Sequence, residues 1–313
     1  MSESKGVWIW AEQRDGALAS VVYELLGGAR KLADSLGQPL GAVLLGDGVE
    51  GLVRNLFEYG ADQVYLVESP DLKQLRDEAY VQVLAALAGK YQPDVLLLGG
   101  TVAGRSVAAR LAARLKVGLA GDCTGVETGP EGRLKLTRPA FGGNIIATVL
   151  AAGRPQMATV RLKTFAKGTR QEGRGGQLIR EAAAIDGTLL HTRVADFVAE
   201  LAGKVKLEEA DIIVSGGRGL GDPSKFKLLE ELCQVLGAAL GASRAAVDAG
   251  WIPYSTRWAR PAGRSAPRST SRSASPGRFS TWPECSLRTS SWLSTRIRTP
   301  PSSRWPLSGS WAI

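Results

Sequence analysis

Hydrophobic positions in the first half of the chain fall alternately into short continuous runs and into helical spacing. Runs such as "PDVLLLGG" at residues 93–100 are typical of buried strands, whereas apolar residues three or four apart predict helices. The runs predict strands at residues 6–12, 41–46, 63–68 and 93–100, and the helical spacing predicts helices at 17–36, 49–59, 77–90 and 104–116. Strands that alternate with helices in this way predict βαβ units and a parallel sheet.

From residue 122 to 162 the pattern changes, because apolar runs follow one another with no helical segment between them. The expected strands lie at residues 123–128, 133–141, 144–150 and 156–162. A polar stretch at 167–177 predicts a loop, and a second βα unit begins at residue 210, where "ADIIV" leads into a glycine-rich turn and a helix. The pattern therefore predicts an α/β fold made of two α/β domains with parallel sheets, and a boundary near residues 185–208.

Residues 256–313 differ in composition from the rest of the chain. They contain ten Arg, one acidic residue and five of the eight Trp, but no Lys. The whole chain has 39 basic and 30 acidic residues, so residues 1–255 keep 29 of each, and the net charge of +9 belongs to the tail alone. Residues 1–255 therefore give no electrostatic reason to expect a nucleic acid or an anionic membrane as partner. The tail predicts a disordered arm, since dispersed Arg, Ser and Pro bury too little apolar area to offset ordering entropy.

Several classes of protein are disfavoured by what the chain lacks. The N-terminus has no basic segment followed by an apolar one, as in a secretory signal, and no apolar run approaches the roughly 20 residues of a membrane span. The three Cys have no CxxC spacing, which argues against a disulfide framework or a metal site. His191 is the single histidine and no GxSxG motif is present, so we expect no catalytic residue and a structural or surface role for His191. We expect a cytoplasmic protein without membrane insertion.

Two glycine motifs in the first domain have alternative interpretations. "GGTVAGRS" at residues 99–106 matches a phosphate-binding loop except that Arg105 replaces the lysine, and we favour a close strand-to-helix turn. "RPAFGGN" at residues 138–144 is either a tight turn that needs positive φ or a backbone kept bare so that a ring or a partner can approach. The residues alone do not decide between these two readings.

Two further loops, both in the second unit, predict a dinucleotide site. In "SGGRGLGDPSKF", Asp222 and Pro223 are typical of a helix N-terminus, and the glycines let an arginine and backbone amides converge on a phosphate. "GASRAAVD" adds a hydroxyl and a second guanidinium near the next helix start. The predicted cofactor-binding residues are Gly217, Arg218, Gly219, Ser243 and Arg244.

At these residues the chain resembles the α subunit of electron transfer flavoprotein. The likeness covers roughly residues 5–255 and rests on five segments in the family's order: "LLLGGTVAGRSVAARLAARLKVGLAGDCT", "RPAFGGNIIAT", "RPQMATVR", "SGGRGLG" and "LGASRAAVDAGWIPYS". The resemblance implies a nucleotide-hydrolase-like domain at residues 1–188 and the first part of an FAD-binding domain at 206–255. It places Arg218 and its glycines near the flavin and its phosphates, and Ser243 and Arg244 on the pyrophosphate or the ring edge.

The resemblance also implies an electron carrier rather than an enzyme with its own substrate. Such a subunit pairs with a β subunit, with AMP as a possible ligand of that partner. It passes electrons through FAD from acyl-CoA or other primary dehydrogenases, as in fatty acid β-oxidation, to a quinone oxidoreductase or a similar acceptor. The alternative from another class is a nucleotide-binding or sensor module made by the N-terminal α/β domain alone.

The family's continuation after residue 255 is missing from the printed sequence, but a displaced reading frame restores it. If one nucleotide is missing just after the codon for Thr256, each restored codon joins the last base of one printed codon to the first two bases of the next. The single Trp codon then forces Val, Leu or Met, and the family has Val or Leu at all five Trp positions of the tail. In the displaced frame, residues 257–263 become Gln-Val-Gly-Gln-Thr-Gly-Arg. Residues 276–285 become Ser-Gly-Ala-Ile-Gln-His-Leu-Ala-Gly-Met, and residues 290–295 become Val-Ile-Val-Ala-Ile-Asn. We therefore expect residues 256–313 to be out of frame, and the printed chain to bind FAD weakly or not at all.

Overall fold

The computed structural model describes residues 6–141, 145–194, 207, 210, 212–257, 269–273 and 294–295. The chain divides into two compact units between Lys204 and Val205.

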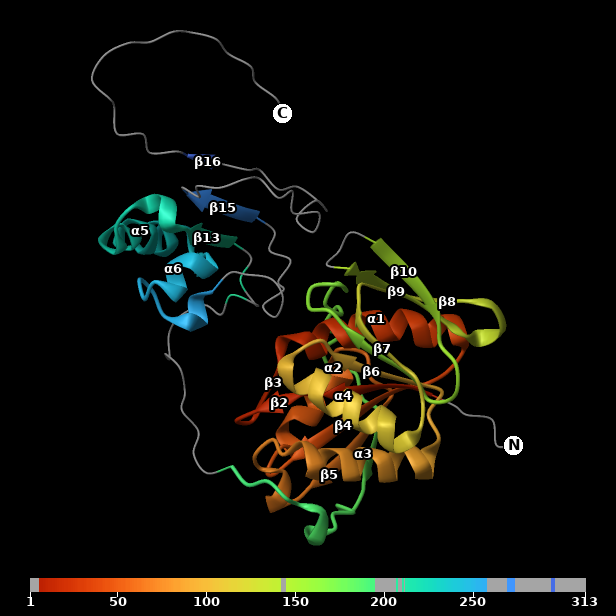
Figure 1. Cartoon of the computed structure of the whole chain (residues 1–313). Coiled ribbons are helices and arrows are strands. Elements are labelled where there is room, and N and C mark those ends of the chain that lie inside the picture. Colours follow the sequence, from red (N-terminus) through yellow and green to blue (C-terminus); the bar gives the residue numbers. More distant parts are fainter. Residues whose placement is uncertain are drawn as a thin grey trace, which may run out of the picture. The chain divides into compact units, whose positions relative to one another are not determined.

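The first unit is built on a seven-stranded parallel sheet (Figure 1). Its strands are β1 (Val7–Ala11), β4 (Leu40–Gly46), β5 (Gln63–Glu68), β6 (Val95–Gly99), β7 (Leu119–Cys123), β11 (Gln156–Val160) and β12 (Gln177–Arg180). Across the sheet they follow the order β12-β5-β4-β1-β6-β11-β7. All residues of the central strand β1 are buried, as expected for a parallel strand that is covered on both faces.

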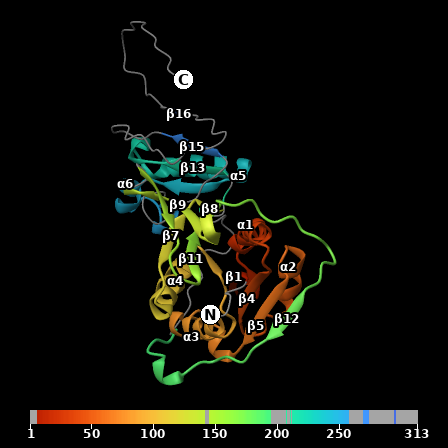
Figure 2. The ribbon, with the colours of Figure 1, turned by 90° about the vertical axis from the view of Figure 1, so that its right-hand side faces the viewer.

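Helices cover both faces of this sheet (Figure 2). They are α1 (Ser20–Leu36), α2 (Val53–Glu58), α3 (Asp77–Tyr91) and α4 (Val102–Leu115). Successive side chains of β1 point to opposite faces, so Ile9 packs with α1 and α2 while Trp10 packs with α3 and α4. Among the described helices, none is long and apolar enough to cross a membrane.

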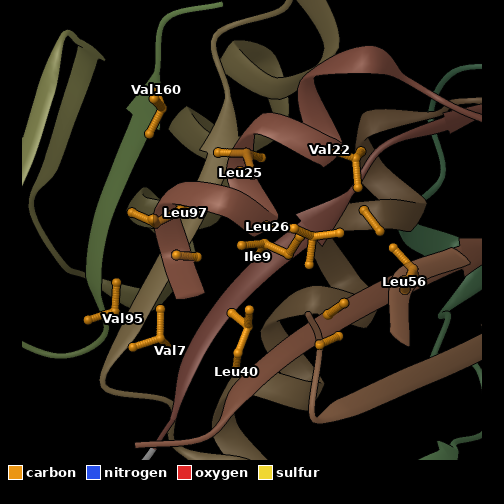
Figure 3. Close-up of a cluster of buried hydrophobic side chains, with 14 of the residues drawn as sticks. Val7, Ile9, Val22, Leu25, Leu26, Leu40, Leu56, Val95, Leu97 and Val160 are labelled. Atoms are coloured by element: carbon orange, nitrogen blue, oxygen red, sulfur yellow. The ribbon is translucent and has the colours of Figure 1, made fainter. Parts of the chain in front are cut away.

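The core under α1 is formed by the apolar residues whose helical spacing places them on one face of this helix. Leu25 and Leu26 of α1 are fully buried, and Figure 3 shows them beside Ile9 of β1, Leu40 of β4 and Leu56 of α2. Burial of one such leucine contributes about 1.5–3 kcal/mol relative to exposure. The apolar face of α1 therefore attaches the helix to three different strands or helices of the unit.

Three antiparallel strands form a second, smaller sheet in the same unit. They are β8 (Gly125–Thr128), β9 (Leu134–Ala140) and β10 (Ile145–Leu150), and β10 pairs with β9 from Ile145↔Ala140 onwards. The shorter elements of this unit are β2 (Gln13–Arg14), β3 (Ala17–Leu18), η1 (Glu50–Leu52), η2 (Pro70–Leu72), η3 (Pro130–Gly132) and η5 (Gly187–Leu189).

The second unit contains a four-stranded parallel sheet of order β14-β13-β15-β16. Its strands are β13 (Ile212–Gly216), β14 (Ala239–Ala242), β15 (Ser269–Ser273) and β16 (Ser294–Thr295). Its helices are η6 (Arg218–Leu220), η7 (Pro223–Lys225), α5 (Phe226–Leu236), α6 (Arg244–Asp248) and η8 (Tyr254–Thr256). Phe226 and Leu229 of α5 pack on Val214 of β13 in a core of their own.

The predicted α/β class with parallel sheets is confirmed, and the differences lie in details of the strands. The run expected as a strand at 156–162 does not stay with the antiparallel strands but inserts as β11 between β6 and β7. The polar stretch at 167–177 is followed at once by β12, an edge strand beside β5 that the pattern did not predict. In the tail, β15 and β16 are strands where a disordered arm was expected, and the remainder of that expectation lies outside the described residues.

Candidate functional site

The turn after β13 is tightly packed and presents an arginine to solvent. A Cβ on Gly216 would lie 2.6 Å from Leu229 Cδ1 and 2.8 Å from Leu220 Cδ1, so a side chain at this position would force these core leucines to shift. Gly217 is buried, and the 3-10 turn η6 begins at Arg218, whose side chain is exposed. Among the described residues Arg218 has no ion pair, so its guanidinium is available to an anion.

The second predicted loop meets the first through a backbone hydrogen bond. The Ser243 amide, directly after β14, donates to the Gly216 carbonyl oxygen at 2.9 Å. The hydroxyl of Ser243 is buried and has no hydrogen-bond partner within the described part of the chain. A buried hydroxyl without a partner costs free energy, and a polar group of a ligand would offset that cost.

The charges at this site are mostly positive and exposed. Arg244 begins α6 and pairs with Asp248 one turn later, with 3.0 Å between Nε and Oδ2, and both side chains are exposed. Such an exposed pair contributes little stability and can exchange partners. Arg244 is therefore a second guanidinium on the same loop as the Ser243 hydroxyl.

The helix start after the glycine turn follows the prediction. The Asp222 side chain caps the turn η7 by accepting a hydrogen bond from the Ser224 amide at 2.8 Å, and Pro223 follows in the first turn. Hydrogen bonds from the side chain and the backbone of Ser224 lower the pKa of Asp222, so its carboxylate stays ionised and holds the turn. The N-terminus predicted at Asp222 and Pro223 is confirmed.

The sheet topology places this pair of loops where open parallel sheets bind ligands. β13 is followed by β14 on one side of it, while β15 pairs on its other side. Ligands of open α/β sheets bind in the crevice at the carboxyl ends of strands, where the strand order reverses. Amides of a glycine turn, a guanidinium and a hydroxyl at that point suit a phosphate or pyrophosphate.

The loop at residues 99–106 is occupied by its own side chains. Thr101 Oγ1 accepts a hydrogen bond from the Gly104 amide at 2.8 Å and donates to Glu12 Oε2 at 2.6 Å, while Arg105 Nε donates to the Gly100 carbonyl at 2.9 Å. A Cβ on Gly104 would lie 2.0 Å from the Gly99 carbonyl. The glycines thus allow helix α4 to begin close to β6, and the interpretation as a strand-to-helix turn agrees with this geometry.

The "RPAFGGN" motif connects β9 and β10, and its Gly142–Asn144 lie outside the described residues. Phe141 has φ 47° and is 81% exposed. Along β10, large apolar side chains are exposed as well, with Ile146 at 70%. We call the exposed residues Phe141, Ile145, Ile146, Val149 and Leu150 the β10 patch. The sequence pattern marked β10 as an apolar strand but did not show that these side chains face solvent.

The single histidine lies at the surface, and the two described cysteines lie in the cores. His191 is exposed, and its backbone amide donates to Glu78 Oε2 at 2.9 Å. Cys123 and Cys233 are buried free thiols, and burial raises the pKa of Cys123 to about 11. Within the described residues, no group of three or more His, Cys, Asp or Glu side chains could hold a metal ion.

Comparison with known families matches both units. A family model described as the electron transfer flavoprotein domain matches residues 7–186, and one described as the electron transfer flavoprotein FAD-binding domain matches residues 206–258. The second match ends within the first residues of the Arg-rich tail.

Three relatives show the extent of the likeness. An electron transfer flavoprotein subunit alpha of Thermoanaerobacterium thermosaccharolyticum is 48% identical over 253 residues, which cover 80% of this chain and 77% of that protein. Protein FixB of Clostridium saccharobutylicum is 44% identical and the electron transfer flavoprotein subunit alpha of Megasphaera elsdenii 41%, each over 80% of this chain and about three quarters of its own length.

Proposed function

This chain belongs to the electron transfer flavoprotein α-subunit family, and from that premise we propose that its second unit holds FAD as an electron carrier. The observation that carries the proposal is the hydrogen bond from the Ser243 amide to the Gly216 carbonyl, which joins two loops at the ligand-binding edge of the sheet. Bound FAD would supply the redox chemistry, and the protein would position it and tune its potential.

The described residues fit a dinucleotide. Gly219 is exposed and the buried Gly217 leads into the same turn, and Arg218 offers an exposed guanidinium. The Ser243 hydroxyl, which has no hydrogen-bond partner among the described residues, can donate to a phosphate oxygen. Arg244 lies next to that hydroxyl and would bind the pyrophosphate or the ring edge. These five residues are the proposed cofactor contacts of this chain.

We further propose a heterodimer with a β subunit, and the β10 patch supports a protein partner for the first unit. Large exposed apolar side chains, here on both faces of β10, are typical of surfaces that other proteins cover. In this scheme AMP, if present, belongs to the β subunit. Primary dehydrogenases such as those for acyl-CoA in fatty acid β-oxidation donate the electrons, and a quinone oxidoreductase or similar protein accepts them.

We propose, finally, that the printed chain is impaired in FAD binding because residues 256–313 are read out of frame. The FAD-binding family match stops at residue 258, where the composition changes. The restored segments would supply the other side of the cofactor site, and the printed Arg, Ser and Pro residues lack them.

A co-expression experiment tests both parts of the proposal. The printed gene and a version with one base inserted after the codon for Thr256 are each expressed with the β subunit, and flavin absorbance near 450 nm, roughly where oxidised flavins absorb, is measured per protein. We expect substoichiometric flavin from the printed chain and stoichiometric flavin from the inserted-base version. Stoichiometric flavin in the printed chain would contradict the impairment, and absence of flavin from both would contradict the FAD assignment.

A matched pair of variants tests the site itself. In the inserted-base version, Arg218→Ala is expected to weaken FAD binding by on the order of tenfold or more, because a charge-assisted hydrogen bond is lost. Arg14→Ala removes the same charge from an exposed position of the first unit and serves as control. Equal FAD dissociation constants for the two variants would remove Arg218 from the site.

A further inference from the structure

Strand β15 has an interior place in the sheet of the second unit but a sequence unlike its neighbours. It pairs with β13 residue for residue from Ile212↔Ser269 to Gly216↔Ser273, and β16 pairs on its other side. The neighbouring strands read "IIVSG" for β13 and "ALGA" for β14, whereas β15 reads "STSRS". The register is that of a sheet strand, and the residues are those of a polar loop.

The residues packed around β13 indicate which kind of residue suits the neighbouring strand position, which β15 occupies. Val214 of β13 is buried in the core beneath α5, and Ile213 is buried on the opposite face with Ala210 and Ala239. Strands beside such a strand in a parallel sheet are as a rule also covered on both faces, and they are apolar runs. Ser, Thr and Arg supply too little apolar area for that place.

The genetic code connects this polar run to an apolar one. In the frame displaced by one base, a restored residue takes the last base of the preceding codon and the first two bases of its own. A serine codon that begins with TC then becomes Phe, Leu, Ile or Val, whichever base precedes it. With such codons, Ser269, Ser271 and Ser273 all become large apolar residues, and Thr270 becomes Tyr, His, Asn or Asp.

Just before β16, the genetic code allows fewer restored residues at each position. The Trp292 codon forces Val, Leu or Met at its own position. Because that codon ends in G, Leu293 can become only Ala or Val, whichever leucine codon is present. Ser294, the first residue of β16, again becomes Phe, Leu, Ile or Val if its codon begins with TC. In the displaced frame, residues 292–294 thus form an apolar run that leads into β16.

We infer that β15 and β16 are strands of the displaced frame, and that only a product read in that frame completes the sheet of the second unit. The inference rests on the proposed frame change, but it concerns the folding of the sheet rather than flavin binding. It assigns apolar residues to positions 269, 271, 273 and 292–294 of the complete protein.

Hydrogen exchange at the amides of β13 tests the inference. Three full-length products are compared without added flavin: the printed chain, the version with one base inserted after the codon for Thr256, and a control with one base inserted after the codon for Thr295. The control undergoes the same insertion but keeps β15 and β16 in the printed frame. We expect the amides of Ile212–Gly216 to exchange on the order of tenfold or more slowly in the Thr256 version than in the other two.

A printed-frame chain with Ser269→Leu, Ser271→Ile and Ser273→Val is the second measurement. It is expected to recover part of the protection of β13, because only the strand residues have changed. Equal exchange of β13 in the printed and Thr256-inserted products would overturn the inference, as would a stop codon in the displaced frame before residue 295 or an unfolded second unit in the Thr256 version. A protected β13 in a Thr256-inserted product that carries no flavin when co-expressed with the β subunit would support the inference and contradict the FAD assignment, so the two failures are distinguishable.

Discussion

At the scale of single residues, the candidate site depends on contacts that no local pattern contains. The Gly216 carbonyl and the Ser243 amide are 27 positions apart in the chain, yet they share one hydrogen bond. The sequence pointed to both loops because glycines, arginines and a serine follow two strands. It could not show that the Ser243 hydroxyl is buried with no hydrogen-bond partner among the described residues, since that depends on packing.

Burial of a thiol leads to a pH prediction for the first unit. Burial raises the pKa of Cys123 from 9.0 to about 11, so the folded state holds the proton more tightly than the unfolded state between these values. The stabilisation is fully present below pH 9 and is lost as pH rises through 11. We expect the free energy of unfolding to fall by about 2 kcal/mol over this range on account of Cys123.

This contribution is measured by urea unfolding of the parent chain and of Cys123→Ala, each at pH 8.5 and at pH 11. These two pH values span the rise of the Cys123 pKa from 9.0 to about 11. The variant is expected to lose less stability between the two pH values than the parent chain. Burial also raises the pKa of Tyr65 and of Tyr80 to about 12, but both tyrosines are common to the two proteins and cancel in the comparison. An identical pH dependence would show that the Cys123 thiol is not the group involved.

At the scale of elements, the pattern of apolar residues predicted the main helices and strands, since each depends on burial of one face or of a whole strand. It missed β7 and β12, the two edge strands of the seven-stranded sheet, because these strands of five and four residues have little apolar content. It also could not show why α1 contains two adjacent glycines. A Cβ on Gly27 would lie 2.4 Å from the Ala166 carbonyl, and one on Gly28 would lie 2.1 Å from Phe165 Cδ2.

A pair of glycine-to-alanine variants separates this packing from helix propensity. Alanine favours a helix over glycine by about 1 kcal/mol. At Gly89 of α3 a Cβ meets nothing within 4 Å, so Gly89→Ala is expected to stabilise the unit by about 0.5–1 kcal/mol. Gly27→Ala is expected to destabilise it by about 2 kcal/mol or more, because the methyl group overlaps the backbone of residue 166. Thermal unfolding of both variants measures these two changes in stability. Stabilisation by Gly27→Ala would show that the backbone at residue 166 moves away from the added methyl group.

At the scale of the whole molecule, the first unit has its own cores on both faces of its sheet, built from residues of that unit. The second unit has a smaller core under α5, and its sheet depends on strands from the tail. The two units therefore differ in how much of their folding the printed sequence supports.

A truncation tests the independence of the first unit. The chain ended after Lys204 is expected to unfold in one cooperative transition, with a free energy of unfolding within about 1 kcal/mol of the first unit's transition in the full chain. Circular dichroism during urea unfolding measures the cooperativity and the free energy of this transition in the truncated and in the full chain. Loss of the cooperative transition on truncation would show that the first unit needs the second for its stability.

The order of amino acids alone decided the alternation of strands and helices and the positions of the glycine loops, because each is a local consequence of side-chain chemistry. It also showed the change of composition at residue 256, which we attribute to the reading frame. Tertiary structure decided that β11 inserts between β6 and β7, that Arg105 turns back onto its own loop, and that the Ser243 amide reaches Gly216. These outcomes depend on hydrogen bonds and packing between residues distant in the chain. Local spacing carries no information about which distant partner a backbone group will find.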